Sequence, residues 1–285
     1  MAPQSAKMKL DHTAALVTSW AAPLYEHGPA AAFVDQLDLS NGQELLARCH
    51  DVCPWYGEVI RDRKNFLRHC IQRELTTRAE QCQVVILAAG VSPLALELLL
   101  SQRDRVTKVI EVDIAGMPEK HRLYAAVAPD LADRIACVTA DITTAGFSAG
   151  MLKAEGGYQP DAPTIVLFEG ISYYITEAQL RHAMGVFRST KQQNVIILEH
   201  LLPCALVNEA RRSIPSGIFR TIGAYAGVSN IRCYSRGHVE SLFRSLRGSN
   251  VRHYSSTDME RVRNDKPRRF VEDGDGWIGC AVGAV

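Results

Sequence analysis

The sequence predicts an α/β protein built on a doubly wound, Rossmann-like and mostly parallel sheet. From Gln83 onward, short apolar runs alternate with segments long enough for helices. The runs are apolar throughout rather than at every second residue, so both faces of each strand must be covered, as in parallel sheets with crossover helices. The five runs are Val84–Leu87, Val106–Val112, Arg134–Ala140, Thr164–Glu169 and Asn194–Glu199.

The segments between these runs fit the crossover role. Each of three segments is long enough for a helix that connects two parallel strands, namely Pro93–Gln102, Pro118–Ala128 and Glu177–Thr190. The alternation of strand and helix therefore predicts helices on both faces of the sheet.

The end of the chain predicts an antiparallel edge on this sheet. Helix-like stretches occur at Ala205–Arg212 and Val239–Leu246. Two weaker strand signals follow, at Val251–Ser255 and Trp277–Val282. A terminal hairpin made of these two strands would close an otherwise parallel sheet.

The first eighty residues show helical periodicity and no convincing strand. Apolar residues recur there at three- and four-residue spacing, which is typical of amphipathic helices. We therefore expect a helical cap segment over residues 1–80 and a Rossmann-like domain over 81–285, together forming one compact unit. The four helix-like stretches are Ala14–Trp20, Ala30–Leu37, Gln43–Cys49 and Val59–Leu75.

Composition and charge favour a small-molecule substrate. The net charge of the 285 residues is +1, which gives no field for nucleic acid, and the basic stretch Arg261–Arg269 suits a solvated loop. No apolar run reaches the length of a membrane span, and the N-terminus lacks the apolar core of a secretory signal, so we expect a cytoplasmic protein. The eight cysteines show no metal-ligand spacing, so we expect reduced thiols and no metal. Nothing in the sequence indicates an oligomeric state.

The ends of the predicted strands carry the candidate binding residues, because ligands of open α/β sheets bind beyond the carboxyl ends of the strands. The first strand ends in a loop of small residues that includes Ala88 and Gly90, where backbone N–H groups can approach a ligand, although such a loop also permits close packing. About twenty residues later Asp113 is placed to hold the hydroxyls of a ribose. Its neighbour Glu111 would then cap the next helix or face solvent.

The third and fourth strand ends add further polar residues. Asp141 could accept from a purine amine while Ile142 covers the ring, or Asp141 could cap the next helix. The fourth strand ends in Glu169, followed by Tyr173 and Tyr174, whose ring faces attract cations. One of the two tyrosines could instead pack in the core.

Four segments, read in order, resemble the leucine carboxyl methyltransferase-like family, in particular its polyketide O-methyltransferases, within the class I S-adenosylmethionine methyltransferases. The resemblance covers about Val84 to Ile175. Four motifs in register are specific, whereas each motif alone is not. The segments are VVILAAGVSP, VIEVDIAGMPEKHRL, TADIT and FEGISYYIT.

This resemblance implies S-adenosylmethionine as cofactor. It also implies an N-terminal basic residue for the cofactor carboxylate, for which Arg63 is the first candidate and Arg61 the second. Two departures stand out: Ala88 replaces the glycine that usually begins the family's loop, and Val91-Ser92-Pro93 lacks the aspartate that usually follows the second glycine. The implied cofactor contacts are Ala88, Gly90, Asp113, Asp141, Ile142 and Glu169.

The function expected from the resemblance is methylation of a carboxylate or hydroxyl of a small molecule of secondary metabolism. Tyr174, with Tyr173 beside it, would orient the reacting end of the cofactor. A hydroxyl acceptor needs a base, and His200 after the fifth strand is placed for that, unless backbone groups satisfy it. Residues Ser216–Tyr225 and Tyr234–His238 are expected to form part of a lid.

Two other functions remain open. In the first, S-adenosylmethionine is itself the substrate, and attack of its amine on its own γ-carbon gives azetidine-2-carboxylate and methylthioadenosine. The altered loop and the lack of an obvious acceptor-selecting insertion favour this cyclase. In the second, the chain is a non-catalytic module that binds S-adenosylmethionine, although the acids Asp113, Asp141 and Glu169 speak against that.

Overall fold

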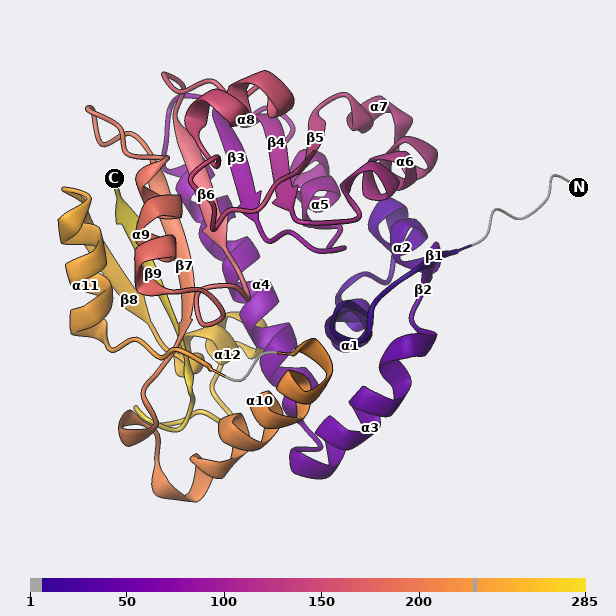
Figure 1. Ribbon diagram of the computed structural model, residues 1–285, viewed down its shortest axis with the longest axis vertical. Helices are drawn as coiled ribbons and strands as arrows, with labels where there is room; N and C mark the ends of the chain where they lie inside the picture. Colours follow the sequence, from indigo (N-terminus) through magenta and orange to yellow (C-terminus); the bar gives the residue numbers. More distant parts are fainter. Residues whose placement is uncertain (1–6, 228–229) are drawn as a thin grey trace, which may run out of the picture.

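The computed structural model describes residues 7–227 and 230–285, and its centre is a seven-stranded sheet (Figure 1). The strands lie in the order β5-β4-β3-β6-β7-β9-β8. Their bounds are β3 Cys82–Leu87, β4 Val106–Asp113, β5 Ile135–Thr139, β6 Thr164–Phe168, β7 Val195–Leu201, β8 Ser249–Tyr254 and β9 Ile278–Ala284.

The five apolar runs all form strands, and these strands pair in parallel, as predicted. β3, β6 and β7 are buried along their whole length, which explains why their residues are apolar on both faces. The predicted antiparallel edge is confirmed: β9 pairs antiparallel with both β7 and β8. β9 thus lies between β7 and β8, so that β8 is the edge strand on this side of the sheet and β5 is the edge strand on the other.

Helices cover both faces of the sheet. The core residues of α4, α5 and α6 belong to one buried cluster, and those of α8, α9 and α11 belong to another. Because successive residues of a strand point to opposite faces, β3 contributes Val84 and Ile86 to the first cluster and Val85 and Leu87 to the second. These helices are α4 Tyr56–Thr76, α5 Leu94–Ser101, α6 Met117–Val127, α8 Ala149–Gly156, α9 Glu177–Gly185 and α11 Arg236–Ser245, and the short α7 Pro129–Ala132 follows α6.

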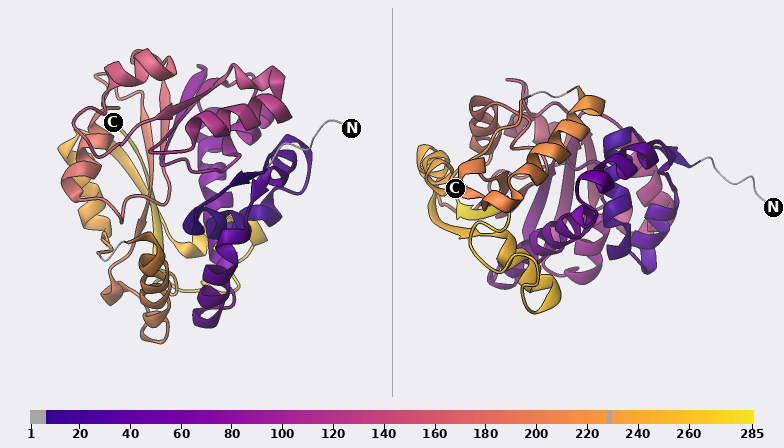
Figure 2. Two further views of the ribbon diagram at one scale, coloured as in Figure 1. Left: turned by 45° about the vertical axis from the view of Figure 1, so that its right-hand side comes forward. Right: turned by 90° about the horizontal axis from the view of Figure 1, so that it is seen from below.

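The remaining helices of the first eighty residues lie beyond the carboxyl ends of the strands, together with α10 (Figure 2). α1 contacts α3, α4 and α10, so the N-terminal segment and a late part of the chain together cover that end of the sheet. A two-stranded parallel ribbon, β1 with β2, lies in this region, where no strand was predicted; each strand has only two residues, too few for a periodic signal. The bounds are β1 Met8–Lys9, α1 His12–Ala21, α2 Gly28–Asp35, β2 Leu37–Asp38, α3 Gln43–Val52 and α10 Ser213–Ala226.

Two expectations for the last third of the chain are wrong. The stretch Ala205–Arg212 is not a helix but two short 3₁₀ turns, Cys204–Leu206 and Glu209–Arg211, because the backbone of Val207 and Asn208 between them is extended. The regular helix, α10, begins only at Ser213.

The basic stretch Arg261–Arg269 is not simply a solvated loop. Its first half belongs to α12 (Ser256–Asn264), and Arg263 donates to Asp62 and Glu58 of α4, both at 2.6 Å. Charge density alone could not show that Arg263 faces this acidic pair. Within the described residues, no helix combines the length and the apolar character needed to cross a membrane.

Candidate active site

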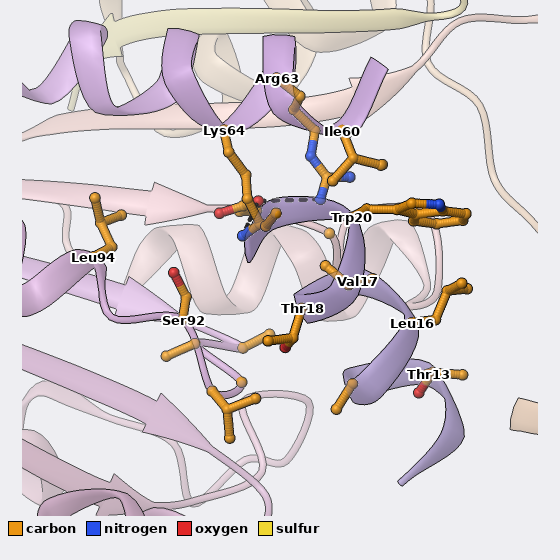
Figure 3. Close-up of a pocket in the computed structure, with 18 of the residues that line it drawn as sticks. Thr13, Leu16, Val17, Thr18, Trp20, Ile60, Arg63, Lys64, Ser92 and Leu94 are labelled. Atoms are coloured by element: carbon orange, nitrogen blue, oxygen red, sulfur yellow. Dashed lines mark hydrogen bonds and ion pairs between the residues drawn. The ribbon is translucent and has the colours of Figure 1, made fainter. Parts of the chain in front are cut away.

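A cavity of about 400 Å³ opens at the carboxyl ends of β3, β4 and β6 (Figure 3). Its walls come from the loop after β3, from α1 and α4 of the N-terminal segment, and from α10. Seven of the residues singled out in the sequence line this cavity: Arg63, Ala88, Gly90, Asp113, Glu169, Tyr173 and Tyr174. Four others, Arg61, Asp141, Ile142 and His200, are not part of its lining.

The loop after β3 contains two residues with left-handed backbone. Ala88 has φ of +52° and Gly90 has φ of +51°. A Cβ atom at Gly90 would meet no atom within 4 Å, so its backbone borders open space. The Gly90 N–H donates to Asp113 Oδ2 at 2.8 Å, which fixes the loop to the end of β4.

The loop is supported from behind by a buried network that the sequence analysis missed. The Tyr124 hydroxyl lies 3.1 Å from the Ser92 carbonyl and 2.9 Å from Glu111 Oε2. Lys120 Nζ lies 2.8 Å from the same carboxylate, and both side chains are fully buried. Glu111 therefore neither caps a helix nor faces solvent, contrary to our expectation. Periodicity could not reveal this pairing, because it depends on how α6 packs on β4.

Glu169 lies at the centre of a buried charge cluster. Arg63 Nη2 is 3.1 Å and Lys64 Nζ is 2.8 Å from Glu169 Oε1, and both cations reach it from α4 (Figure 3). Burial alone would raise the pKa of Glu169, but Lys64 and Arg63 outweigh it and hold the pKa below its ordinary value. Lys64 was not predicted, although its position next to Arg63 in Arg61-Asp62-Arg63-Lys64 was the available signal.

The second arginine candidate has a different role. Arg61 donates to the Trp20 carbonyl at 3.0 Å and pairs with Glu58, and so links α1 to α4 outside the cavity lining. Arg63, in contrast, lines the cavity, and its Nε has no hydrogen-bond partner although it is buried. An unpartnered buried donor at a cavity wall is available to an anionic ligand.

Three aromatic rings cluster on one side of the cavity. The rings of Tyr173 and Tyr174 are 4.7 Å apart edge to face, and Phe219 of α10 lies 5.2 Å from Tyr173. Both tyrosines line the cavity, and Tyr173 also belongs to the first core cluster. Burial raises the pKa of Tyr174 to about 12, so this hydroxyl stays protonated at neutral pH.

Asp141 and Ile142 make contacts within the chain. Asp141 Oδ1 accepts from the Thr143 N–H at 2.8 Å and from its hydroxyl at 2.7 Å, so it closes a turn. The helix that follows is capped by Ser148 instead, which corrects the capping alternative. Ile142 is buried in the core cluster on the opposite face of the sheet.

His200 is not placed to act as a base in this cavity. Alternate residues of β7 face opposite sides of the sheet, and His200 lies on the side away from α4, where its ring packs on Gly279. Burial lowers the pKa of His200 to about 4. Its neighbour Glu199 faces the α4 side instead, where its Oε2 accepts from the Gly170 N–H at 2.7 Å.

Part of the segment expected to form a lid lines the cavity. Phe219 and Ile222 of α10 line the cavity, and both fall within the predicted stretch Ser216–Tyr225. Tyr234–His238 contributes no lining residue; Tyr234 packs in the second core cluster, and α11 begins at Arg236.

Comparisons with known proteins agree with this architecture. A candidate methyltransferase from Thermobifida fusca superposes with a TM-score of 0.67 at 13% identity, over 99% of this chain and 96% of that one. A DUF574 family protein from Streptomyces avermitilis superposes with a TM-score of 0.64 at 14% identity, over 96% and 97% of the two chains. At such identities the likeness shows a shared fold. None of the curated protein sequences matches the chain.

The family is shown by a sequence profile. The profile of the leucine carboxyl methyltransferase family matches residues 19–186, which is more than half of the chain. The match includes the last three residues of α1, all of α4, and the strand ends that border the cavity. The protein therefore belongs to the leucine carboxyl methyltransferase family and is an enzyme of the methyltransferase type, with S-adenosylmethionine as its cofactor.

Proposed function

We propose that this enzyme methylates a carboxylate of a small molecule, with a hydroxyl as the less favoured acceptor, in secondary metabolism. One observation carries the proposal: a single cavity brings together the glycine-containing loop, the acid at the end of β4, a carboxylate flanked by two cations, and a pair of tyrosines. These groups match, one by one, the parts of S-adenosylmethionine.

The lining residues fit this cofactor chemically. The buried Nε of Arg63 has no partner and offers a donor to the amino-acid carboxylate. Glu169 can accept from the ammonium group, and Asp113 from the ribose hydroxyls. Gly90 leaves open space where a side chain would otherwise stand.

The cofactor supplies a methyl group on a positively charged sulfur, and the chain binds, orients and shields it. Ring faces such as those of Tyr173 and Tyr174 attract a cation, and the apolar wall from α1 and α10 excludes water. The protonated hydroxyl of Tyr174 can donate a hydrogen bond but cannot take a proton at neutral pH.

The choice between carboxylate and hydroxyl follows from the bases at hand. No histidine occurs among the described residues that line the cavity, and Glu169 is neutralised by Arg63 and Lys64. The other two carboxylates of the lining accept from backbone N–H groups, Asp113 from Gly90 and Asp11 from Ala14. A carboxylate is already ionised at neutral pH and needs no base, whereas a hydroxyl does. The lining therefore favours a carboxylate.

One observation favours a second function, the cyclisation of S-adenosylmethionine to azetidine-2-carboxylate and methylthioadenosine. Phe219 stands on the α10 side of the cavity and packs edge-on against Tyr173. A ring in that position separates the cavity from a neighbouring one and would shield a bound cofactor from an external acceptor.

The two functions are distinguished by the thioether that forms. Purified protein is incubated with S-adenosylmethionine alone, and the products are separated and identified by mass spectrometry. Methyl transfer predicts no methylthioadenosine above the protein-free blank, and formation of S-adenosylhomocysteine only when an acceptor is added. Methylthioadenosine together with azetidine-2-carboxylate in equal amounts would refute methyl transfer and establish the cyclase.

A further inference from the structure

A second cavity, of about 630 Å³, lies next to the first. It is bounded by the end of β7, by α10, and by the segments that precede α11 and β9. Most of its lining is apolar, with Leu201, Val207, Ile231 and Trp277 among the residues on its wall. Its volume is in the range of a site for a small organic molecule, which is roughly 300 to 1,000 Å³.

The two cavities share one residue. Phe219 lines both, and its ring packs against Tyr173 and Tyr174 on the side of the first cavity. A molecule in the second cavity would therefore end at the same ring that borders the tyrosine pair. Because the Phe219 ring stands between the two cavities, a methyl acceptor in the second cavity reaches the first when that ring turns aside.

The charge on the described lining of the second cavity is positive. Arg220, next to Phe219 on α10, is the one charged residue among the described lining residues. Within residues 7–227 and 230–285 its guanidinium has no hydrogen bond or ion pair with any side chain or carbonyl. The lining holds no described carboxylate that would repel an anion. An exposed, unpaired guanidinium beside an apolar wall suits a ligand with an apolar body and one anionic group.

We propose that the second cavity is the acceptor site and that it takes an apolar small molecule with an anionic group held at Arg220. This proposal rests on the proposed methyl transfer and names the class of its acceptor. The apolar body packs against Trp277 and Val207, and the acceptor meets the first cavity at Phe219. Specificity then comes from apolar contact and one charge, rather than from many hydrogen bonds.

A pair of fluorescent probes tests the proposal. 1-Anilinonaphthalene-8-sulfonate carries an apolar ring system and an anion, and N-phenyl-1-naphthylamine is the same ring system without the anion. Both are titrated into the full chain with S-adenosylhomocysteine at saturation, so that the first cavity is filled. Arg220→Gln is expected to raise the Kd of the sulfonate about tenfold and to leave the Kd of the amine within about twofold, because only the sulfonate loses a charge-assisted bond.

A second pair of variants locates the probes in the cavity. Ala224→Trp places a large ring at the lining, and Ala210→Trp places the same ring on the surface outside both linings. Ala224→Trp is expected to raise the Kd of both probes about tenfold, and Ala210→Trp to raise neither. The proposal is overturned if the sulfonate does not bind, if Arg220→Gln affects both probes equally, or if the two tryptophan variants behave alike.

The alkylation rate of the two exposed cysteines measures binding without fluorescence. Cys204 and Cys233 line the second cavity, whereas the other six cysteines are buried or partly buried. Bound sulfonate is expected to slow alkylation of these two thiols by iodoacetamide several-fold, as read by peptide mass spectrometry; unchanged rates would count against binding there. Calorimetry with S-adenosylhomocysteine distinguishes failure of the proposed methyl transfer from failure of the proposed acceptor site. If that product does not bind, the proposed function fails, whatever the probes show.

Discussion

At the scale of single residues, the loop after β3 lines the cavity and carries backbone strain. Ala88 adopts φ of +52°, a left-handed conformation that costs an L-residue with a Cβ about 1–2 kcal/mol. The family's loop usually has glycine at this position. Alanine in place of glycine at position 88 therefore leaves the loop in a backbone conformation that alanine disfavours.

Ala88→Gly should relieve this strain. Glycine costs about 0.5–1 kcal/mol more conformational entropy on folding, so the net expectation is a rise of roughly 0.5 kcal/mol in the free energy of unfolding. Urea denaturation measures it. Ala89→Gly is the matched control, because Ala89 is not at positive φ and should lose about 0.5–1 kcal/mol. Equal losses in the two variants would show that Ala88 is not strained.

Glu169→Gln should weaken both stability and cofactor binding. The change leaves Arg63 and Lys64 without their buried partner, which we expect to cost about 3 kcal/mol. Because the pKa of Glu169 is lowered in the folded protein, its contribution is fully present above the unfolded value of about 4.3 and is lost as the pH falls through the lower folded pKa. Urea unfolding of both proteins between pH 7 and pH 3 should show the difference shrinking only at the acidic end. A difference that disappears near pH 6 would contradict this assignment.

At the scale of elements, the sequence predicted the strands well; of the C-terminal helices it predicted α11, over Val239–Leu246, but not α10 or α12. Runs such as Val84–Leu87 are buried on both faces, so every residue in them is apolar and the strand can be recognised from its own sequence. α12 was missed because its sequence is dominated by charge, and its stability comes from partners on α4 that are two hundred residues away in the chain. A pattern in one segment cannot reveal partners in another.

The contact between α12 and α4 makes its own prediction. Asp62 is buried, its Oδ1 accepts from Arg263, and its Oδ2 has no partner, so Arg263→Ala would leave the carboxylate without the guanidinium, at a cost of about 2 kcal/mol. Arg261→Ala, two residues away, removes only an exposed pair with Asp258 and should cost less than about 0.5 kcal/mol. Thermal unfolding of the two variants compares them directly. If both lose the same stability, the ion pairs of Arg263 do not hold α12 in place.

At the scale of the whole molecule, the sequence predicted the cavity-lining residues whose place follows from strand order, but not those whose place depends on tertiary packing. Asp113 and Glu169 follow parallel strands, so their placement at one edge of the sheet followed from topology. His200 was expected after the fifth strand but lies within β7, on the opposite face, and Asp141 follows β5 but closes its own turn. The parity of β7 residues could have identified Glu199, rather than His200, as the residue on the face of Glu169.

The cavity also depends on parts of the chain that no strand pattern predicts. α1 and α4 from the N-terminal segment and α10 from the C-terminal third complete its walls. Arg63 and Lys64 are brought to Glu169 by α4, which is more than a hundred residues earlier in the sequence. The resemblance to a family suggested an N-terminal arginine, and only the packing of α4 separates Arg63 from Arg61.

Calorimetric titration with S-adenosylmethionine tests the central claim most directly, with wild type, Arg63→Gln and Arg61→Gln compared. Arg63 lines the cavity and Arg61 does not, so the account predicts one-to-one binding by wild type, a Kd raised about tenfold to a hundredfold by Arg63→Gln, and a Kd changed less than about threefold by Arg61→Gln. Absence of binding to wild type, or an equal loss in the two variants, would contradict the claim that this cavity holds the cofactor.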